Sequence, residues 1–268
     1  MLHAPVAQLV EQLTCNQQVV SSNLTGSSNY KKNLVIAKFF SYNENVMNYQ
    51  EYLQVLLNYG EEKYAKFSAN LTNSDYNVIG VRIPILRKVV KDHYRDENLL
   101  LSTFELGQYL EIDISYLAIG FLRCQTVAEQ LAFLKDNMKI AKSWVVTDII
   151  ASYCKKITFE DYWQFFIQTC DDEHIYVRRF AFVFGLKFYR DKKILQTFSF
   201  IKDNEDYMVY MGQAWLLATI AICYPHAVYD FLRKGASLHL KNKTIAKIKE
   251  SYRIDNVTKN QFVGLRKA

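Results

Sequence analysis

Apolar residues recur every three or four positions through most of the chain after residue 47, and alternating β-type runs are lacking. This period is that of an amphipathic helix. The first clear segment begins at Met47 and places Tyr49, Leu53, Leu56 and Leu57 on one predicted face. Further helices are predicted near 85–94, 111–123, 126–140, 144–156, 173–190, 206–223, 226–234, 238–252 and 256–266.

Three local signals mark predicted helix starts. Pro84 suits the first turn of a helix, where its missing N–H costs nothing. The segments 102–105 (Ser-Thr-Phe-Glu) and 158–161 (Thr-Phe-Glu-Asp) each place an acid three residues after a hydroxyl, the pattern of a capping box.

Only 9 Gly and 3 Pro occur in 268 residues, which favours long helices with short connections over a turn-rich β-sandwich. Helix pairs of roughly 35 to 45 residues are typical of HEAT and armadillo repeats. The predicted fold class is therefore all-α, a HEAT-like or armadillo-type α-solenoid of paired antiparallel helices.

Residues 1–46 differ from the rest because they are rich in Asn, Gln and Ser and poor in charge. We expect a poorly ordered N-terminal extension there. Residues 7–28 also look like translated non-coding sequence, so synthesis is suspected to start at Met47. The folded domain is predicted to span 47–268.

The segment 207–229 contains no charged residue and is long enough to span a bilayer. Its Gly212, Gln213, Pro225 and His226 favour a pair of buried core helices instead. The first 20 residues lack the basic start and apolar run of a secretory signal. We expect a cytoplasmic protein without a membrane segment.

The five cysteines are scattered without a CxxC pair, and the five histidines are isolated. This pattern predicts reduced thiols and no metal site. The net charge of +6 is concentrated at one end, since residues 232–268 hold ten Lys or Arg against two acids. Such a block either attracts phosphate backbones or is an ordinary solvated helix face.

Four residues of the segment 143–155 follow one another at steps of three or four on a face that is not the apolar one: Trp144, Asp148, Ser152 and Lys155. An indole and a carboxylate therefore share a surface. Either they form a site, or Trp144 packs on a neighbouring helix and Asp148 is an ordinary exposed acid.

The segment after Arg178 and Arg179 is apolar on every side, so its helix is predicted to be central. Arg179 is then either directed at a groove or held in an ion pair, with Asp148 as the candidate partner. Arg178 is either functional or a solvated end residue. Core packing is the default interpretation of Trp215, and Trp163 is assigned to the core without a function.

Residues 47–267 resemble the DNA alkylation repair family, the AlkD-like HEAT-repeat DNA glycosylases. Five pieces in the family's order carry this resemblance: 79–87 (IGVRIPILR), 143–148 (SWVVTD), 176–186 (YVRRFAFVFGL), 213–217 (QAWLL) and 242–253 (NKTIAKIKESYR).

The resemblance implies a solenoid whose concave groove grips double-stranded DNA, with excision of N3- or N7-alkylated purines and no metal or other cofactor. By position, Asp148 corresponds to the catalytic carboxylate, Trp144 and Trp215 to the indoles that flank the damaged nucleotide, and Arg179 to the arginine that faces the DNA beside it. Ala218 departs from the best-studied members, in which a basic residue stands at this position.

The resemblance also gives the basic end a role, with Lys243, Lys247 and Arg253, together with Arg178, as candidate phosphate contacts. We expect a monomer that hydrolyses N-glycosyl bonds of cationic purines. Two alternatives stay open: a non-catalytic solenoid that binds distorted or branched DNA, and a protein-interaction scaffold.

Overall fold

The computed structural model describes residues 47–72, 75–202 and 206–266. From Asn48 onward these residues belong to one compact unit. The expectations for residues 1–46 lie outside the described residues.

The described residues form helices without a strand, and their nearest approach to a sheet is an isolated bridge between Asn77 and Tyr109. The all-α prediction is confirmed. The α-helices are α3 (Tyr49–Asn58), α4 (Glu62–Thr72), α5 (Ile83–His93), α6 (Leu110–Arg123), α7 (Val127–Asn137), α8 (Trp144–Ala151), α9 (Phe159–Thr169), α10 (Ile175–Gly185), α11 (Tyr207–Ile220), α12 (Pro225–Lys234), α13 (Leu238–Glu250) and α14 (Asn256–Gly264). Short 3₁₀ helices are η1 (Leu101–Thr103), η2 (Met138–Ile140), η3 (Leu186–Phe188) and η4 (Lys192–Phe200).

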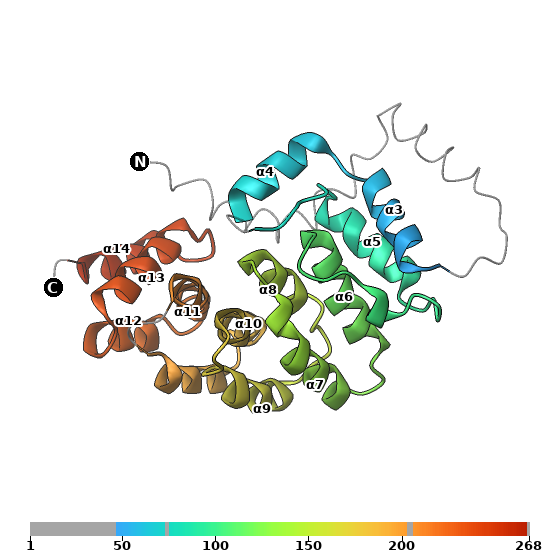
Figure 1. Cartoon of the computed structure of the whole chain (residues 1–268). Coiled ribbons are helices and arrows are strands. Elements are labelled where there is room, and N and C mark those ends of the chain that lie inside the picture. The colour runs from blue at the N-terminus through green and yellow to red at the C-terminus, as the bar shows by residue number, and fades with distance from the viewer. Residues whose placement is uncertain (1–46, 73–74, 203–205, 267–268) are drawn as a thin grey trace. The chain divides into compact units, whose positions relative to one another are not determined.

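One row of helices runs through the unit. Helix α6 contacts α8, α8 contacts α10, α10 contacts α11, and α11 contacts α13, while α7 and α9 contact each other beside this row (Figure 1). Helix α10 is central, as predicted, because Val177 and every residue from Arg179 to Gly185 are buried. Its phenylalanines meet Tyr162 of α9, whose ring centroid lies 5.1 Å from that of Phe184.

The sequence signals for helix starts had mixed outcomes. Thr158 caps α9 in the predicted capping box, accepting from the Asp161 N–H at 3.2 Å. The signal at Ser102 is wrong, because that segment forms only η1 and the next α-helix begins at Leu110 without a side-chain cap.

The predicted apolar face of α3 is partly wrong. Leu57 is 44% exposed, whereas Tyr52 is fully buried together with Leu56. Periodicity could not predict that Tyr52 is more buried than Leu57. The ring of Tyr52 packs against Phe104 and His93, which come from later segments of the chain.

The uncharged segment 207–229 forms two helices, α11 and the start of α12, as the pattern favoured. Among the described residues, no helix has the length and apolar character needed to cross a bilayer. The described cysteines, Cys124, Cys154, Cys170 and Cys223, are all free thiols.

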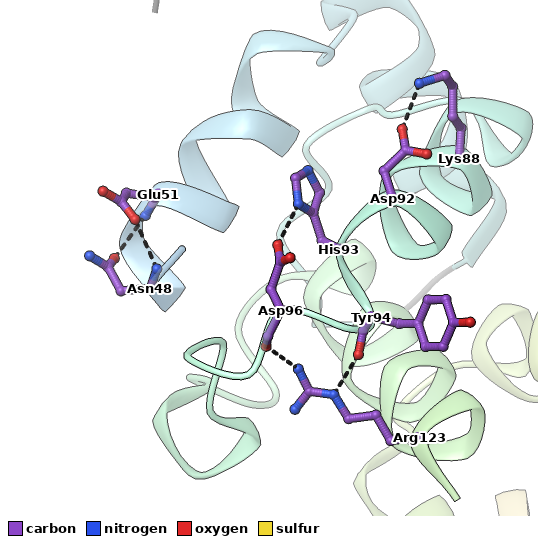
Figure 2. A network of polar contacts seen from close by, with 8 residues as sticks. All are labelled: Asn48, Glu51, Lys88, Asp92, His93, Tyr94, Asp96 and Arg123. Carbon is purple, nitrogen blue, oxygen red and sulfur yellow. Dashed lines mark hydrogen bonds and ion pairs between the residues drawn. The ribbon is translucent and has the colours of Figure 1, made fainter. Parts of the chain in front are cut away.

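Arg123, at the end of α6, fixes the loop that follows α5 (Figure 2). Its guanidinium donates to the main-chain oxygens of Tyr94, Leu99 and Asp96 at 2.6, 2.9 and 2.7 Å. His93 Nδ1 lies 2.8 Å from Asp96 Oδ2 in the same loop. The guanidinium therefore satisfies carbonyls that a tight connection leaves without helical partners.

Candidate functional site

Asp148 of α8 and Arg179 of α10 form a two-pronged ion pair. Arg179 Nε donates to Asp148 Oδ1 at 3.0 Å, and Nη2 donates to Oδ2 at 2.9 Å. The two side chains are only 9% and 5% exposed, respectively. Asp148 is therefore not an ordinary exposed acid, and the ion pair that the sequence left open for Arg179 is present.

Arg179 also reaches a third helix. Its Nη1 donates to the main-chain oxygen of Met208, in the first turn of α11, at 2.7 Å. One buried guanidinium thus links α8, α10 and α11 and orients Asp148 between them. Because the planar fork of arginine matches a carboxylate, a lysine could not reproduce these three directions.

Thr147 supplies a further polar contact. Its buried hydroxyl lies 3.0 Å from Asp148 Oδ1 and 2.7 Å from the main-chain oxygen of Trp144. A hydroxyl has one proton, so it donates to one of these acceptors at a time. A carboxylate accepts at about four lone-pair positions, which leaves Asp148 at least one for a water or substrate atom.

Trp144 lies beside this pair. The Arg179 guanidinium carbon stands 5.8 Å from the centroid of the Trp144 ring. The indole is half-buried, at the first position of α8, while Val146, Ile149 and Ile150 bury the opposite face as the pattern predicted. The indole and the carboxylate therefore share one partly accessible surface.

A buried network anchors the start of α8, and sequence reasoning did not find it. Tyr76 donates to Asp113 Oδ2 at 2.6 Å, and the Lys142 N–H donates to the Tyr76 hydroxyl at 3.0 Å. The Gly107 N–H donates to the other oxygen of Asp113 at 2.8 Å. Burial raises the pKa of Asp113, and burial together with this carboxylate raises the pKa of Tyr76.

Trp215 lies on α11, one turn beyond a close approach to Arg179. A methyl group added at Gly212 would stand 3.5 Å from both the Cγ and the main-chain oxygen of Arg179. Trp215 is half-buried, whereas Ala214 and Leu216 beside it are fully buried. Ala218 is buried as well, so this position exposes no side chain to a ligand.

The predicted basic contacts are spread over the unit. Arg178 directs its Nη1 at the main-chain oxygens of Asp172 and Glu173, at 2.6 and 3.1 Å. Lys243 Nζ lies 5.2 Å from the centroid of Tyr207 at the start of α11.

The other two basic residues lie farther along. Arg253 lies 5.5 Å over Tyr189, beyond the far end of α10, and Lys247 Nζ is 3.5 Å from Glu250 Oε2. Of the three C-terminal residues, Lys243 is the one whose described contact lies at the end of α11 that contacts Arg179.

Among the residues that the structure describes, no group of His, Cys, Asp and Glu side chains could hold a metal ion. The site is instead a carboxylate of fixed orientation with an indole beside it. Such an arrangement stabilises positive charge that develops next to it and can orient a water molecule.

Comparison with known families gives the decisive match. The model of the family described as DNA alkylation repair enzyme matches residues 52–253, which include the whole of α5 to α13. The chain belongs to this family. The resemblance recognised in the sequence is confirmed, and the protein is related to enzymes of DNA repair. Neither the curated proteins nor the solved structures gave a match.

Proposed function

We propose that this protein is a monofunctional DNA glycosylase that releases N3- and N7-alkylated purines from double-stranded DNA. The observation that carries the proposal is the buried Asp148–Arg179 pair beside the half-buried indole of Trp144. A chain that served only as a scaffold would have no need to keep a carboxylate at 9% exposure in an ion pair whose guanidinium lies 5.8 Å from a half-buried indole.

The chemistry needs few protein groups. An N3- or N7-alkylated purine already carries positive charge, so it leaves as a neutral base and needs no proton from a general acid. Positive charge then develops on the deoxyribose, as in glycoside hydrolysis. Asp148 stabilises this charge and orients the attacking water through its unused lone pair.

The remaining site residues bind and orient in this proposal. Trp144 and Trp215 contact the damaged nucleotide, and each adds about 0.5 to 2 kcal/mol of cation–π attraction for its charge. Arg179 is a positioning residue for Asp148, since its side chain is 5% exposed and each of its three guanidinium nitrogens donates a hydrogen bond. Arg178, Lys243, Lys247 and Arg253 contact phosphates.

The row α6–α8–α10–α11–α13 supports the proposal of a HEAT-like solenoid, because each helix contacts the next member of the row. We propose that Trp144 and Asp148, at the accessible side of this row, face a concave groove that receives the duplex. We further propose a cytoplasmic monomer that requires no cofactor.

Release of 3-methyladenine and 7-methylguanine from methylated duplex DNA tests the activity. Asp148→Asn is expected to lose most of the rate and to keep DNA binding, because the amide preserves shape without charge. Asp92→Asn, a matched change at an acid that is 46% exposed, is the control. Equal rates for wild type and Asp148→Asn would falsify the mechanism.

One observation favours the alternative of a non-catalytic protein that binds distorted DNA. Both carboxylate oxygens of Asp148 already accept from Arg179 in the absence of DNA, and the buried Ala218 offers no basic contact. That alternative predicts tight binding to damaged or branched duplexes with no base release by the wild type.

A further inference from the structure

Helix α11 is buried along almost its whole length, except for one ridge. Val209, Tyr210, and every residue from Gly212 to Ile220 other than Trp215 are buried. The residues left accessible are Tyr207, Met208, Met211 and Trp215. Steps of four from 207 to 215 form a single ridge on a helix surface.

Tyr207 is the most accessible member of this ridge, at 51% exposure. At this exposure the ring of Tyr207 contributes little to the core, although most of α11 is buried. Its neighbour is a cation, since Lys243 Nζ of α13 lies 5.2 Å from the ring centroid. Lys243 forms no ion pair with any acid in the described part of the chain.

This aromatic and cationic pair is fixed relative to the candidate site. Met208, the next residue, accepts from Arg179 Nη1, and Arg179 in turn holds Asp148. One turn earlier on α13, the ring of His239 packs 5.0 Å from that of Tyr210. The starts of α11 and α13 are therefore connected to the site through the part-buried hydrogen bond between Arg179 and Met208.

The combination of an exposed ring and an ammonium beside it fits contact with a nucleic-acid strand, with the ring against a base or sugar and the cation on a phosphate. Tyr207 and Trp215 are eight residues apart, which is about 12 Å along a helix. A B-form strand advances about 3.4 Å per nucleotide, so this distance spans about three nucleotides.

We propose that Tyr207 and Lys243 form a second DNA contact, which holds the damaged strand about three nucleotides from the damaged position. This inference rests on the proposed function. It adds Tyr207 to the DNA-contacting residues and places the contact at a defined position along the damaged strand. It also assigns Lys243 to this contact, separately from Lys247 and Arg253.

Binding to a short duplex with one stable abasic analogue tests the contact without any chemical step. Tyr207→Ala is expected to weaken Kd by roughly 5- to 30-fold, and Tyr207→Phe to bind as wild type, because the ring and not the hydroxyl carries the contact. Lys243→Gln is expected to reduce the slope of log K against log salt by about one.

The matched control is Lys135→Gln, on α7, whose ammonium contacts Gln168 and not the ridge. This variant is expected to bind as wild type. Circular dichroism melting of every variant checks that the fold is retained.

The register is tested by replacing single phosphates of the damaged strand with neutral methylphosphonates. One phosphate about three nucleotides from the abasic position is expected to weaken wild-type binding and to have no effect on Lys243→Gln. Wild-type affinity of both Tyr207→Ala and Lys243→Gln would overturn the inference while leaving the proposed function standing. No duplex binding by the wild type would overturn both.

Discussion

Arg179 joins Asp148 to the first turn of α11, through paired bonds at 3.0 and 2.9 Å on one side and a 2.7 Å bond to the Met208 oxygen on the other. Removing the guanidinium leaves a carboxylate at 9% exposure without an ion-pair partner. Arg179→Met is therefore expected to lower the free energy of unfolding by about 3 to 5 kcal/mol. Urea denaturation measures this loss.

A second substitution separates the structural cost from the functional one. Arg179→Met combined with Asp148→Leu is expected to regain much of the stability, since a buried pair replaced by apolar groups is often neutral. The double variant should remain inactive in base release. If it were as unstable as Arg179→Met alone, the unpaired charge would not be the cause of the loss.

Trp215→Ala is expected to reduce base release strongly and stability only modestly. The indole is half-buried, so its loss should cost less than the about 3 to 5 kcal/mol of a fully buried Trp or Phe replaced by Ala. Thermal melting and single-turnover release measure the two effects. Phe180→Ala, at a fully buried ring of α10, is the comparison. Equal melting losses for the two variants would place Trp215 in the core.

Glu111 gives the protein a dependence of stability on pH. Its buried carboxylate accepts from the N–H groups of Ile79, Gly80 and Val81, and burial raises its pKa above 4.5 despite these bonds. A raised folded pKa means that the stabilising contribution is fully present below the unfolded pKa and is lost as the pH rises through the folded value.

The predicted consequence concerns Glu111→Gln. The free energy of unfolding of the wild type should fall relative to that of the variant as the pH rises above about 4.5. Urea titrations at a series of pH values measure the difference between the two curves. Parallel curves would show that Glu111 titrates as in the unfolded chain.

The backbone at position 80 accepts only a residue without a side chain. Its φ is +91°, and an added Cβ would stand 2.5 Å from the Glu61 oxygen. Gly80→Ala is therefore expected to cost more than about 1 kcal/mol. Gly235→Ala, where no atom lies within 4 Å of the added Cβ, should change stability little. Similar losses at both positions would contradict this account.

The sequence placed Trp144 and Asp148 on one face of α8 because a helix brings these positions together through its period alone, but the predicted step to Lys155 runs past the end of the helix at Ala151. The pairing with Arg179 was also within reach, since a buried arginine in an apolar helix needs an acid. The family match explains why five short motifs in order were enough to recognise the relationship.

The remaining parts of the site depend on contacts that periodicity does not encode. Tyr76 reaches Asp113 across 37 residues and Lys142 across 66. The acceptor of Arg179 on α11 is a main-chain oxygen, so no side-chain pattern marks it. Thr147 looks like an ordinary core position until its hydroxyl is seen beside Asp148.

The paired state of Asp148 before any DNA arrives has a consequence in a cell crowded with magnesium and polyamines. A carboxylate without an ion-pair partner would bind such cations. Each bound cation would have to dissociate before a damaged nucleotide could bind beside the indole. In this protein the counterion of Asp148 is the side chain of Arg179, which also donates a hydrogen bond to the Met208 oxygen. Loose cations must therefore compete with a tethered one, and under the proposed mechanism Asp148 would stay available to the charge that forms during the reaction.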